Sequence, residues 1–90
     1  MVSRTMTITN ALGLHARAAA RFVHTASGYS SKIRVARGAR VMDGKSILGL
    51  LLLAAARGTE VVITAEGADE SAAVDALCRL VTEGFGEPCA

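Results

Sequence analysis

The stretch Arg4–Phe22, RTMTITNALGLHARAAARF, changes its hydrophobic period halfway along its length. Over Arg4–Asn10, threonines alternate with apolar residues, which predicts a strand with one buried face. After a turn at Asn10–Gly13, the apolar spacing from Ala16 to about Ser27 becomes helical. A strand followed at once by an amphipathic helix is therefore the first unit of the predicted fold. The side chains expected on the buried face of this helix are Ala19, Phe22, Val23 and Ala26.

The alternating pattern returns in three further segments. Lys32–Arg37 and Arg40–Asp43 are separated only by Gly38-Ala39, so we expect them to form neighbouring strands joined by a tight link. Glu60–Glu66, EVVITAE, predicts a fourth strand. Its buried face is expected to consist of Val61, Ile63 and Ala65.

Two more helices are predicted in the second half of the chain. The segment from Ser46 to about Ala55 begins with a good capping residue, because a serine hydroxyl accepts a backbone N–H of the first turn. Arg57-Gly58 is expected to end this helix. The last helix is expected to open at Asp69 and Glu70 and to end at Gly84, Gly86 and Pro88. Its expected core face is Ala73, Val74, Leu77, Leu80 and Val81.

The element order is therefore β-α-β-β-α-β-α, in a single domain spanning residues 1–90. Alternation in every strand is explained if helices cover one face of the sheet and solvent covers the other. The predicted class is an α+β open-faced sandwich.

The composition excludes several function classes. Only 3% of the 90 residues are aromatic and the net charge is only +2, which argues against nucleic-acid binding. No apolar run is long enough for membrane insertion and the N-terminus lacks a signal-peptide pattern, so a cytoplasmic location is expected. Cys78 and Cys89 have no zinc-ligand spacing; we expect a reduced, semi-buried Cys78 and an incidental Cys89. No metal or other cofactor is expected.

His15 stands immediately before the first predicted helix. The first backbone N–H groups of a helix lack intrahelical partners, and the helix dipole adds positive charge there. Together they form a phosphate site, here from the amides of Ala16, Arg17 and Ala18, and they favour an uncharged imidazole that can act as a nucleophile. Arg17 is mildly unfavourable at this end of a helix, which an anion partner would explain. The plainer alternative is that His15 is an ordinary exposed turn residue.

Three segments carry a resemblance to a known family. Gly13–Arg17, GLHAR, resembles the active-site motif of the HPr family, the histidine-containing phosphocarriers of the sugar phosphotransferase system. Gly44–Leu50 resembles the regulatory-serine segment of this family, and Thr64–Glu70 resembles its last strand and the entry to its last helix. The resemblance implies a four-stranded antiparallel sheet in the order 1-4-2-3 with three helices on one face.

The resemblance also implies a function. His15 would take a phosphoryl group on Nδ1 from Enzyme I, which phosphoenolpyruvate charges, and would pass it to EIIA domains of sugar permeases. Arg17 would contact the phosphoryl oxygens, and Ser46 would be modified by HPr kinase/phosphorylase in organisms that have that enzyme. The protein would then be a carrier rather than an enzyme, and a monomer. One departure from the family pattern is Ala18, where the family usually has proline.

A partner surface is expected beside His15. Ala20, Arg21 and His24 share an outer face of the first helix with Arg17, where they form either a basic rim for acidic partners or an ordinary solvated face. A metal pair between His15 and His24 is not expected. On the second helix, Leu50 and Leu53 are assigned to the core. The residues left as an exposed apolar docking patch are Ile47, Leu48 and Leu51.

Two interpretations of function stay open. In the first, the protein is a phosphocarrier for sugar transport. In the second, it is a regulatory interaction module of a nitrogen-type or incomplete phosphotransferase branch, which binds a transcription regulator or an enzyme according to its phosphorylation. Ser46 is likewise either a structural cap alone or also a regulatory site, where a phosphate would place negative charge beside the apolar patch.

Overall fold

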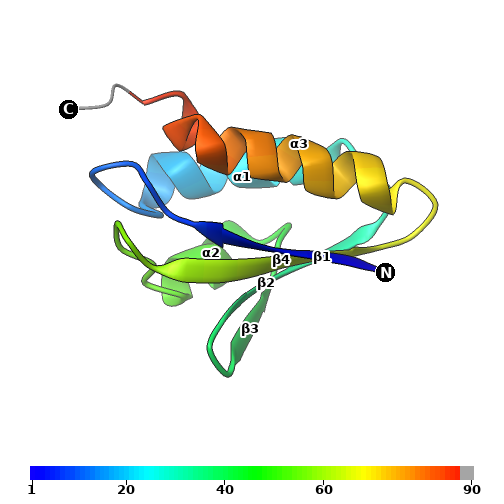
Figure 1. The fold of residues 1–90 in the computed structure, drawn as a ribbon, viewed down its shortest axis with the longest axis horizontal. Coiled ribbons are helices and arrows are strands. Elements are labelled where there is room, and N and C mark those ends of the chain that lie inside the picture. The colour runs from blue at the N-terminus through cyan, green and yellow to red at the C-terminus, as the bar shows by residue number, and fades with distance from the viewer. Residues whose placement is uncertain (88–90) are drawn as a thin grey trace.

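The computed structural model describes residues 1–87, whose strands form one antiparallel sheet (Figure 1). The strands are β1 (Val2–Thr7), β2 (Lys32–Arg37), β3 (Arg40–Asp43) and β4 (Glu60–Glu66). Their order across the sheet is β1-β4-β2-β3. Ile63 of β4 lies opposite Arg4 of β1 on one side and Val35 of β2 on the other. The strand order confirms the prediction.

Within residues 1–87, three α-helices complete the fold, with a short 3-10 turn after the last one. They are α1 (Ala16–Ser27), α2 (Ile47–Leu52) and α3 (Glu70–Thr82), and the 3-10 turn η1 spans Gly84–Gly86. Figure 1 shows α1 and α3 side by side over the sheet. The short α2 packs against α1 and the end of β3. The predicted α+β open-faced sandwich is confirmed.

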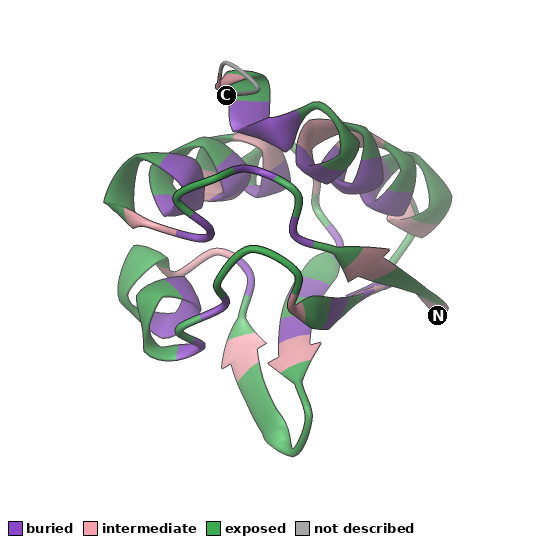
Figure 2. Ribbon diagram, turned by 60° about the vertical axis from the view of Figure 1, so that its left-hand side comes forward, coloured by how far each residue is buried: buried purple, intermediate pink, exposed green. Residues whose placement is uncertain are grey.

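The core lies between the sheet and the helices, as the purple stripes on the facing sides of the ribbon show in Figure 2. Strand alternation brings one residue of every two inward, and apolar residues at helical spacing meet them from the helices. Fully buried side chains come from every layer; the largest include Phe85, Ile33, Leu50, Leu53, Ile63, Leu77 and Val74.

The first strand differs from its prediction at both ends. It begins at Val2 and ends at Thr7, three residues short of Asn10. Ile8 still exchanges hydrogen bonds with the chain before β4, donating to the Thr59 carbonyl at 2.9 Å and accepting from the Gly58 amide at 2.8 Å. Asn10 is buried although it is polar. The alternation of apolar and polar residues therefore extends beyond β1 into a segment that is still hydrogen-bonded at Ile8 but is not part of the regular strand.

Helix α2 is shorter than the sequence predicts, ending at Leu52 instead of about Ala55. Arg37 and Arg40 from the β2–β3 hairpin donate to the carbonyls of Leu53, at 3.0 Å, and Leu52, at 2.6 Å. These cations satisfy carbonyl groups at the end of the helix, and Ala54 then takes a positive φ of 51°. Arg57-Gly58 therefore does not end the helix.

Within residues 1–87, no helix has the length and apolarity needed to cross a bilayer.

Asp69 stands at the start of α3 as predicted, yet its carboxylate does not cap this helix. It accepts four hydrogen bonds from the loop between α1 and β2, from the amides and hydroxyls of Ser30 and Ser31. Chiefly through the Ser31 hydroxyl, these donors lower the pKa of Asp69 to about 2. The carboxylate thus ties two loops together that lie far apart in the sequence.

The inner face of α3 differs from its prediction at two positions. Leu80 is only partly buried, whereas Cys78, which we expected to be semi-buried, is a buried free thiol. Burial raises the pKa of this thiol, so it stays protonated and packs as a small apolar side chain. Pro88 and Cys89 lie outside the described residues.

Candidate functional site

The turn that carries His15 is pressed against the segment after α2. Gly13 has a φ of +68°, and a Cβ at this position would lie 2.7 Å from the Ala55 carbonyl oxygen and 2.9 Å from Ala56 Cα. The next residue, Leu14, is buried and donates its amide to the same Ala55 carbonyl at 2.9 Å. Only glycine combines this conformation with so close a backbone approach. The turn therefore holds the backbone of His15 in a fixed place.

His15 is the N-cap of α1, and its ring accepts the backbone hydrogen bond that a serine or aspartate side chain usually accepts at this position. Its Nδ1 accepts the Arg17 amide at 3.3 Å, while its carbonyl accepts the Ala19 amide at 2.8 Å. A ring nitrogen that accepts a hydrogen bond carries no proton, so this contact assigns the proton of a neutral ring to Nε2. The side chain is 26% exposed. The lone pair of Nδ1 thus points toward the anion-binding end of the helix.

The other ring nitrogen of His15 is paired with a carboxylate from the end of the chain. Nε2 hydrogen-bonds to Oε2 of Glu87, and Asn10 Nδ2 donates to Oε1 of the same carboxylate at 2.8 Å. These hydrogen bonds, Asn10 first and His15 after it, lower the pKa of Glu87. The sequence interpretation missed Glu87 and Asn10 as site residues, because the pairs are 72 and 77 residues apart and no motif spacing marks them.

The residues predicted to bind phosphate surround the cap. Ala16 and Arg17 are exposed, and within residues 1–87 the Arg17 guanidinium makes no ion pair or hydrogen bond, which leaves it available to an anion. Ala18 is different, because its side chain is fully buried in the core. Ala18 can therefore contribute only its backbone amide to an anion at this site.

The outer face of α1 is exposed as predicted, at Ala20, Arg21 and His24. Arg21 is nonetheless engaged within the chain, because its Nη1 donates to the carbonyl of Phe85. Phe85 is itself buried and has a positive φ of 58°. The cation predicted for a partner-facing rim thus also holds the C-terminal segment.

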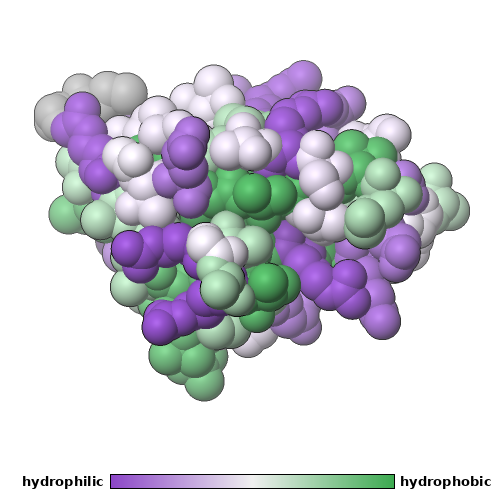
Figure 3. All heavy atoms as spheres, turned by 60° about the horizontal axis from the view of Figure 1, so that its bottom comes forward, coloured by the Kyte–Doolittle hydropathy of each residue, from purple (hydrophilic) through white to green (hydrophobic). Residues whose placement is uncertain are grey.

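Helix α2 exposes an apolar surface, which we call the α2 patch: Ile47 (42% exposed), Leu48 (67%), Leu51 (37%) and Leu52 (52%). The first three were predicted to be exposed; Leu52 was not assigned. Leu50 and Leu53 are fully buried, as predicted. Figure 3, which brings the underside of Figure 1 forward, shows exposed apolar atoms among hydrophilic side chains. Such a mixture is typical of surfaces that bind other proteins transiently.

Ser46 is the N-cap of α2. Its Oγ accepts the Gly49 amide at 3.0 Å, and its carbonyl accepts the Leu50 amide at 3.1 Å. The α2 patch begins at the next residue. The predicted capping role of Ser46 is confirmed, and the hydroxyl lies beside the patch.

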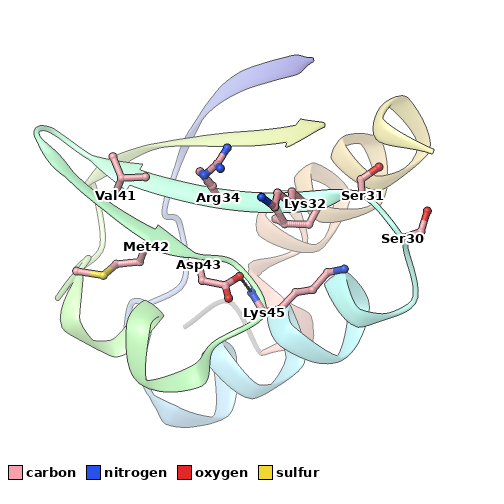
Figure 4. A pocket seen from close by; sticks show the side chains of 9 residues that line it. Ser30, Ser31, Lys32, Arg34, Val41, Met42, Asp43 and Lys45 are labelled. Carbon is pink, nitrogen blue, oxygen red and sulfur yellow. Dashed lines mark hydrogen bonds between the residues drawn. The ribbon is translucent and has the colours of Figure 1, made fainter. Parts of the chain in front are cut away.

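A hollow of ≈ 390 Å³ lies elsewhere, between β2 and the β3–α2 loop (Figure 4). It shares no residue with the His15 site. Four of its polar side chains already have partners. Lys45 donates to the Tyr29 carbonyl at 2.7 Å, Asp43 accepts the Lys45 amide at 2.9 Å, and the hydroxyls of Ser30 and Ser31 donate to Asp69. Its lining is Ser30, Ser31, Lys32, Ile33, Arg34, Val41, Met42, Asp43 and Lys45.

Comparison with known proteins gives a consistent result over nearly the full chain. Residues 2–83 match the family model described as "PTS HPr component phosphorylation site". Phosphocarrier protein HPr of Cupriavidus necator is 44% identical over 87 residues, covering 97% of this chain and 98% of the relative. Phosphocarrier protein NPr of Shewanella violacea is 40% identical over 86 residues, covering 96% and 94%. The crystal structure of HPr-C-His from Thermoanaerobacter tengcongensis superposes with a TM-score of 0.94 at 44% identity, covering 98% of this chain and 99% of that one.

Proposed function

The chain belongs to the HPr family of phosphocarrier proteins of the phosphotransferase system, and we propose that His15 is the residue that carries the phosphoryl group. The observation that supports this assignment is the unprotonated Nδ1 at the mouth of α1, with Nε2 paired to Glu87. A nucleophile needs a lone pair that the electrophile can reach, and Nδ1 meets this need because its only partner is the Arg17 amide at 3.3 Å and the side chain is 26% exposed.

The proposed step needs no proton transfer. The lone pair of Nδ1 forms a bond to phosphorus while the bond between phosphorus and the donor atom breaks, and its electron pair stays with the donor. The proton remains on Nε2, so the phosphorylated ring carries a positive charge, which the Glu87 carboxylate compensates. In the reverse direction the leaving group is a neutral imidazole, which departs more readily than an imidazolate. The same geometry therefore serves loading and unloading.

The phosphoryl oxygens would bind at the mouth of α1. The amides of Ala16, Arg17 and Ala18 supply donors there, and the Arg17 amide exchanges Nδ1 for an oxygen once phosphorus occupies the nitrogen. The Arg17 guanidinium adds a fork of two donors. Charge stabilisation is thus distributed over the helix terminus and one side chain.

We assign Enzyme I as the donor and EIIA domains of sugar permeases as acceptors, which dock on the α2 patch and on the outer face of α1. The exposed apolar side chains Ile47, Leu48 and Leu51 supply contact area, and Ala20, Arg21 and His24 border it with small and basic side chains. A relay of this kind operates in the cytoplasm and with this chain as a monomer. It uses no resident metal or cofactor.

Ser46 is proposed as a second phosphorylation site, for HPr kinase/phosphorylase where the organism has it. A phosphate on Oγ would replace the hydroxyl that now accepts the Gly49 amide and would stay at the positive end of α2. It would add about two negative charges beside the α2 patch. Acidic partners would then dock less tightly without a change of fold.

The test is phosphorylation with phosphoenolpyruvate and a cognate Enzyme I, followed by mass measurement. We expect an acid-labile gain of one phosphoryl group in the wild-type chain and none in His15→Ala. A phosphoryl group that persists in His15→Ala would refute the assignment.

A second function, as a regulatory module of a nitrogen-type or incomplete branch, is favoured by the similarity to a relative named NPr. In this case His15 is still charged, but the phosphorylated chain acts by binding a transcription regulator or an enzyme. One further assay distinguishes the two functions: the phosphorylated protein is mixed with EIIA domains, and transfer of the phosphoryl group is measured. Transfer supports sugar transport, and charging without transfer supports the regulatory module.

A further inference from the structure

We propose that Asn10 and Arg21 are positioning residues, which hold Glu87 so that its carboxylate keeps the proton of His15 on Nε2. The inference deepens the proposed function and rests on it, because it concerns the ring that would carry the phosphoryl group. The C-terminal segment Glu83–Glu87 would otherwise be a short tail after α3. Two side chains from the start of the chain attach it instead to the site.

Asn10 holds the carboxylate of Glu87 directly. Its Nδ2 donates at 2.7 Å to the carbonyl of Gly13, in the turn before His15, and at 2.8 Å to Oε1 of Glu87. One amide group thus links the turn that carries the ring to the carboxylate that pairs with the ring. The orientation of the amide is determined, because a flipped group would place Oδ1 against two acceptor oxygens.

The opposite end of the Asn10 amide indicates that this linkage has a function. Oδ1 is buried and has no hydrogen-bond partner within residues 1–87, in a residue that is only 6% exposed. A buried amide oxygen without a partner is unfavourable, and folded proteins rarely retain one without a reason. In Asn10 the unpaired Oδ1 belongs to the same amide whose Nδ2 donates to Gly13 and Glu87. The cost of burying Oδ1 is therefore accepted together with two hydrogen bonds at the His15 site.

Arg21 holds the backbone of the same segment. Its Nη1 donates to the Phe85 carbonyl, two residues before Glu87, while the Phe85 ring is 1% exposed in the core. Residues 84, 85 and 86 all have positive φ, at 64°, 58° and 76°. A non-glycine residue is strained in this conformation, so the segment needs fixed contacts to keep it. The ring of Phe85 and the guanidinium of Arg21 supply them.

The chemical consequence concerns which ring nitrogen is available. A neutral imidazole exchanges its proton between Nδ1 and Nε2, and only the form with a free Nδ1 can attack phosphorus as proposed. The Arg17 amide at Nδ1 and the Glu87 carboxylate at Nε2 both favour that form, and the carboxylate contributes only while it stays within hydrogen-bond reach. Among the charged side chains of α1, Arg21 acts on Glu87 of this pair and helps to lower its pKa. Displacing Glu87 would therefore reduce the reactive fraction of the ring.

The experiment measures the His15 tautomer directly, by ¹⁵N chemical shifts of the ring in the unphosphorylated protein, above the titration range of both histidines. We expect the wild-type shifts to show the proton on Nε2, and Asn10→Ala and Arg21→Lys to shift toward a mixture of tautomers. His24 is an internal control whose shifts stay constant. Arg21→Lys keeps the positive charge, so a change there is not an effect of losing a charge on the rim.

Transfer from Enzyme I is measured on the same samples. We expect a loss in kcat/KM of up to about tenfold for Asn10→Ala, equivalent to ~1.4 kcal/mol, and a smaller loss for Arg21→Lys. In a Glu87→Gln background neither substitution should reduce transfer further, because both act through that carboxylate. Arg79→Ala, which removes an exposed cation from α3, should leave both readouts unchanged.

Unaltered His15 shifts in both variants, or losses that add fully to that of Glu87→Gln, would overturn the proposal. If Asn10→Ala does not fold, Arg21→Lys and the isosteric Asn10→Asp, which sets a carboxylate against Glu87, decide the result through the same shifts. The proposed function fails separately, if the wild-type chain is not phosphorylated on His15, since the tautomer measurement requires no phosphoryl group.

Discussion

The starts of α1 and α3 place a titratable side chain in the same position and use it in opposite ways. At α1, the His15 ring accepts a single amide of its own helix, at 3.3 Å, and stays 26% exposed. At α3, the Asp69 carboxylate makes no hydrogen bond to its own helix but accepts four hydrogen bonds from Ser30 and Ser31. The first group is held weakly enough to exchange its partner for a phosphoryl group, whereas the second is fully occupied.

The difference shows that position in the fold does not assign a role to a residue; how firmly its hydrogen-bonding groups are already engaged does. The one lone pair of His15 Nδ1 accepts a single long hydrogen bond of 3.3 Å that a phosphoryl group can displace, whereas the oxygens of Asp69 accept four hydrogen bonds. We therefore expect substitutions at the start of α1 to change activity, and substitutions at the start of α3 to change stability.

The largest effect is expected for His15→Asn, which should abolish phosphorylation completely. Asparagine is a good N-cap, so the free energy of unfolding should stay within about 0.5 kcal/mol of the wild type. Phosphoryl incorporation from Enzyme I and urea unfolding measure the two quantities. A strongly destabilised His15→Asn would mean that the ring serves the fold as well, and the contrast with Asp69 would then disappear.

The next largest effect is expected for Asp69→Asn, which should lower the free energy of unfolding without slowing phosphoryl transfer. An amide has one acceptor oxygen in place of two, so donors from Ser30 and Ser31 lose their partner. Urea unfolding at neutral pH and the transfer assay measure this variant. A transfer rate that falls while the remaining protein is folded would connect the two helix starts.

The same carboxylate predicts an acid dependence. Its pKa is about 2 in the folded protein, against an ordinary aspartate pKa of 3.8, so the ionised form favours the folded state. The contribution is present above about pH 4 and is lost as the pH falls through about 2. The difference in unfolding free energy between wild type and Asp69→Asn should therefore shrink over this interval. A constant difference would show that the Ser31 hydrogen bonds do not depend on ionisation.

The start of α2 carries Ser46, whose side chain caps its own helix, and we expect its substitution to have a smaller effect than substitutions of His15 or Asp69. Ser46→Ala removes the cap on the Gly49 amide and should cost about 1 kcal/mol of unfolding free energy. Ser46→Asp should keep the cap, because a carboxylate also accepts that amide, but should weaken docking of acidic partners on the α2 patch. Urea unfolding and binding to Enzyme I distinguish the two. Equal binding by both variants would argue against a regulatory charge at this site.

The smallest effect is expected for Ala18→Pro, in the first turn of α1. Proline has no N–H to leave unpaired there and restricts the unfolded chain, so we expect a gain of up to about 1 kcal/mol in unfolding free energy. The full burial of Ala18 opposes this gain, because the ring must fit against the core. Thermal unfolding and the transfer rate report the balance. A clear loss of both would show that the ring does not fit.

The sequence predicted the regular elements well where local pattern determines them. The bounds of α1, β2, β3 and β4 agree with their predictions because period, glycine and caps all indicate the same ends. The end of α2 could not be predicted, since Arg37 and Arg40 reach it from a hairpin that precedes it in the chain. The site divides in the same way. One motif was enough to predict His15 and Arg17 as site residues. Asn10 and Glu87 meet only in the folded chain, because no local signal links residues 77 positions apart.

The pairing of His15 with Glu87 also has a consequence for biosynthesis. The carboxylate partner of the ring follows it by 72 positions in the chain. During translation the histidine leaves the ribosome long before the residue that fixes its proton has been added. A nascent chain that has not yet reached Glu87 therefore exposes an imidazole without its partner, and the complete site appears only after residue 87 has been added.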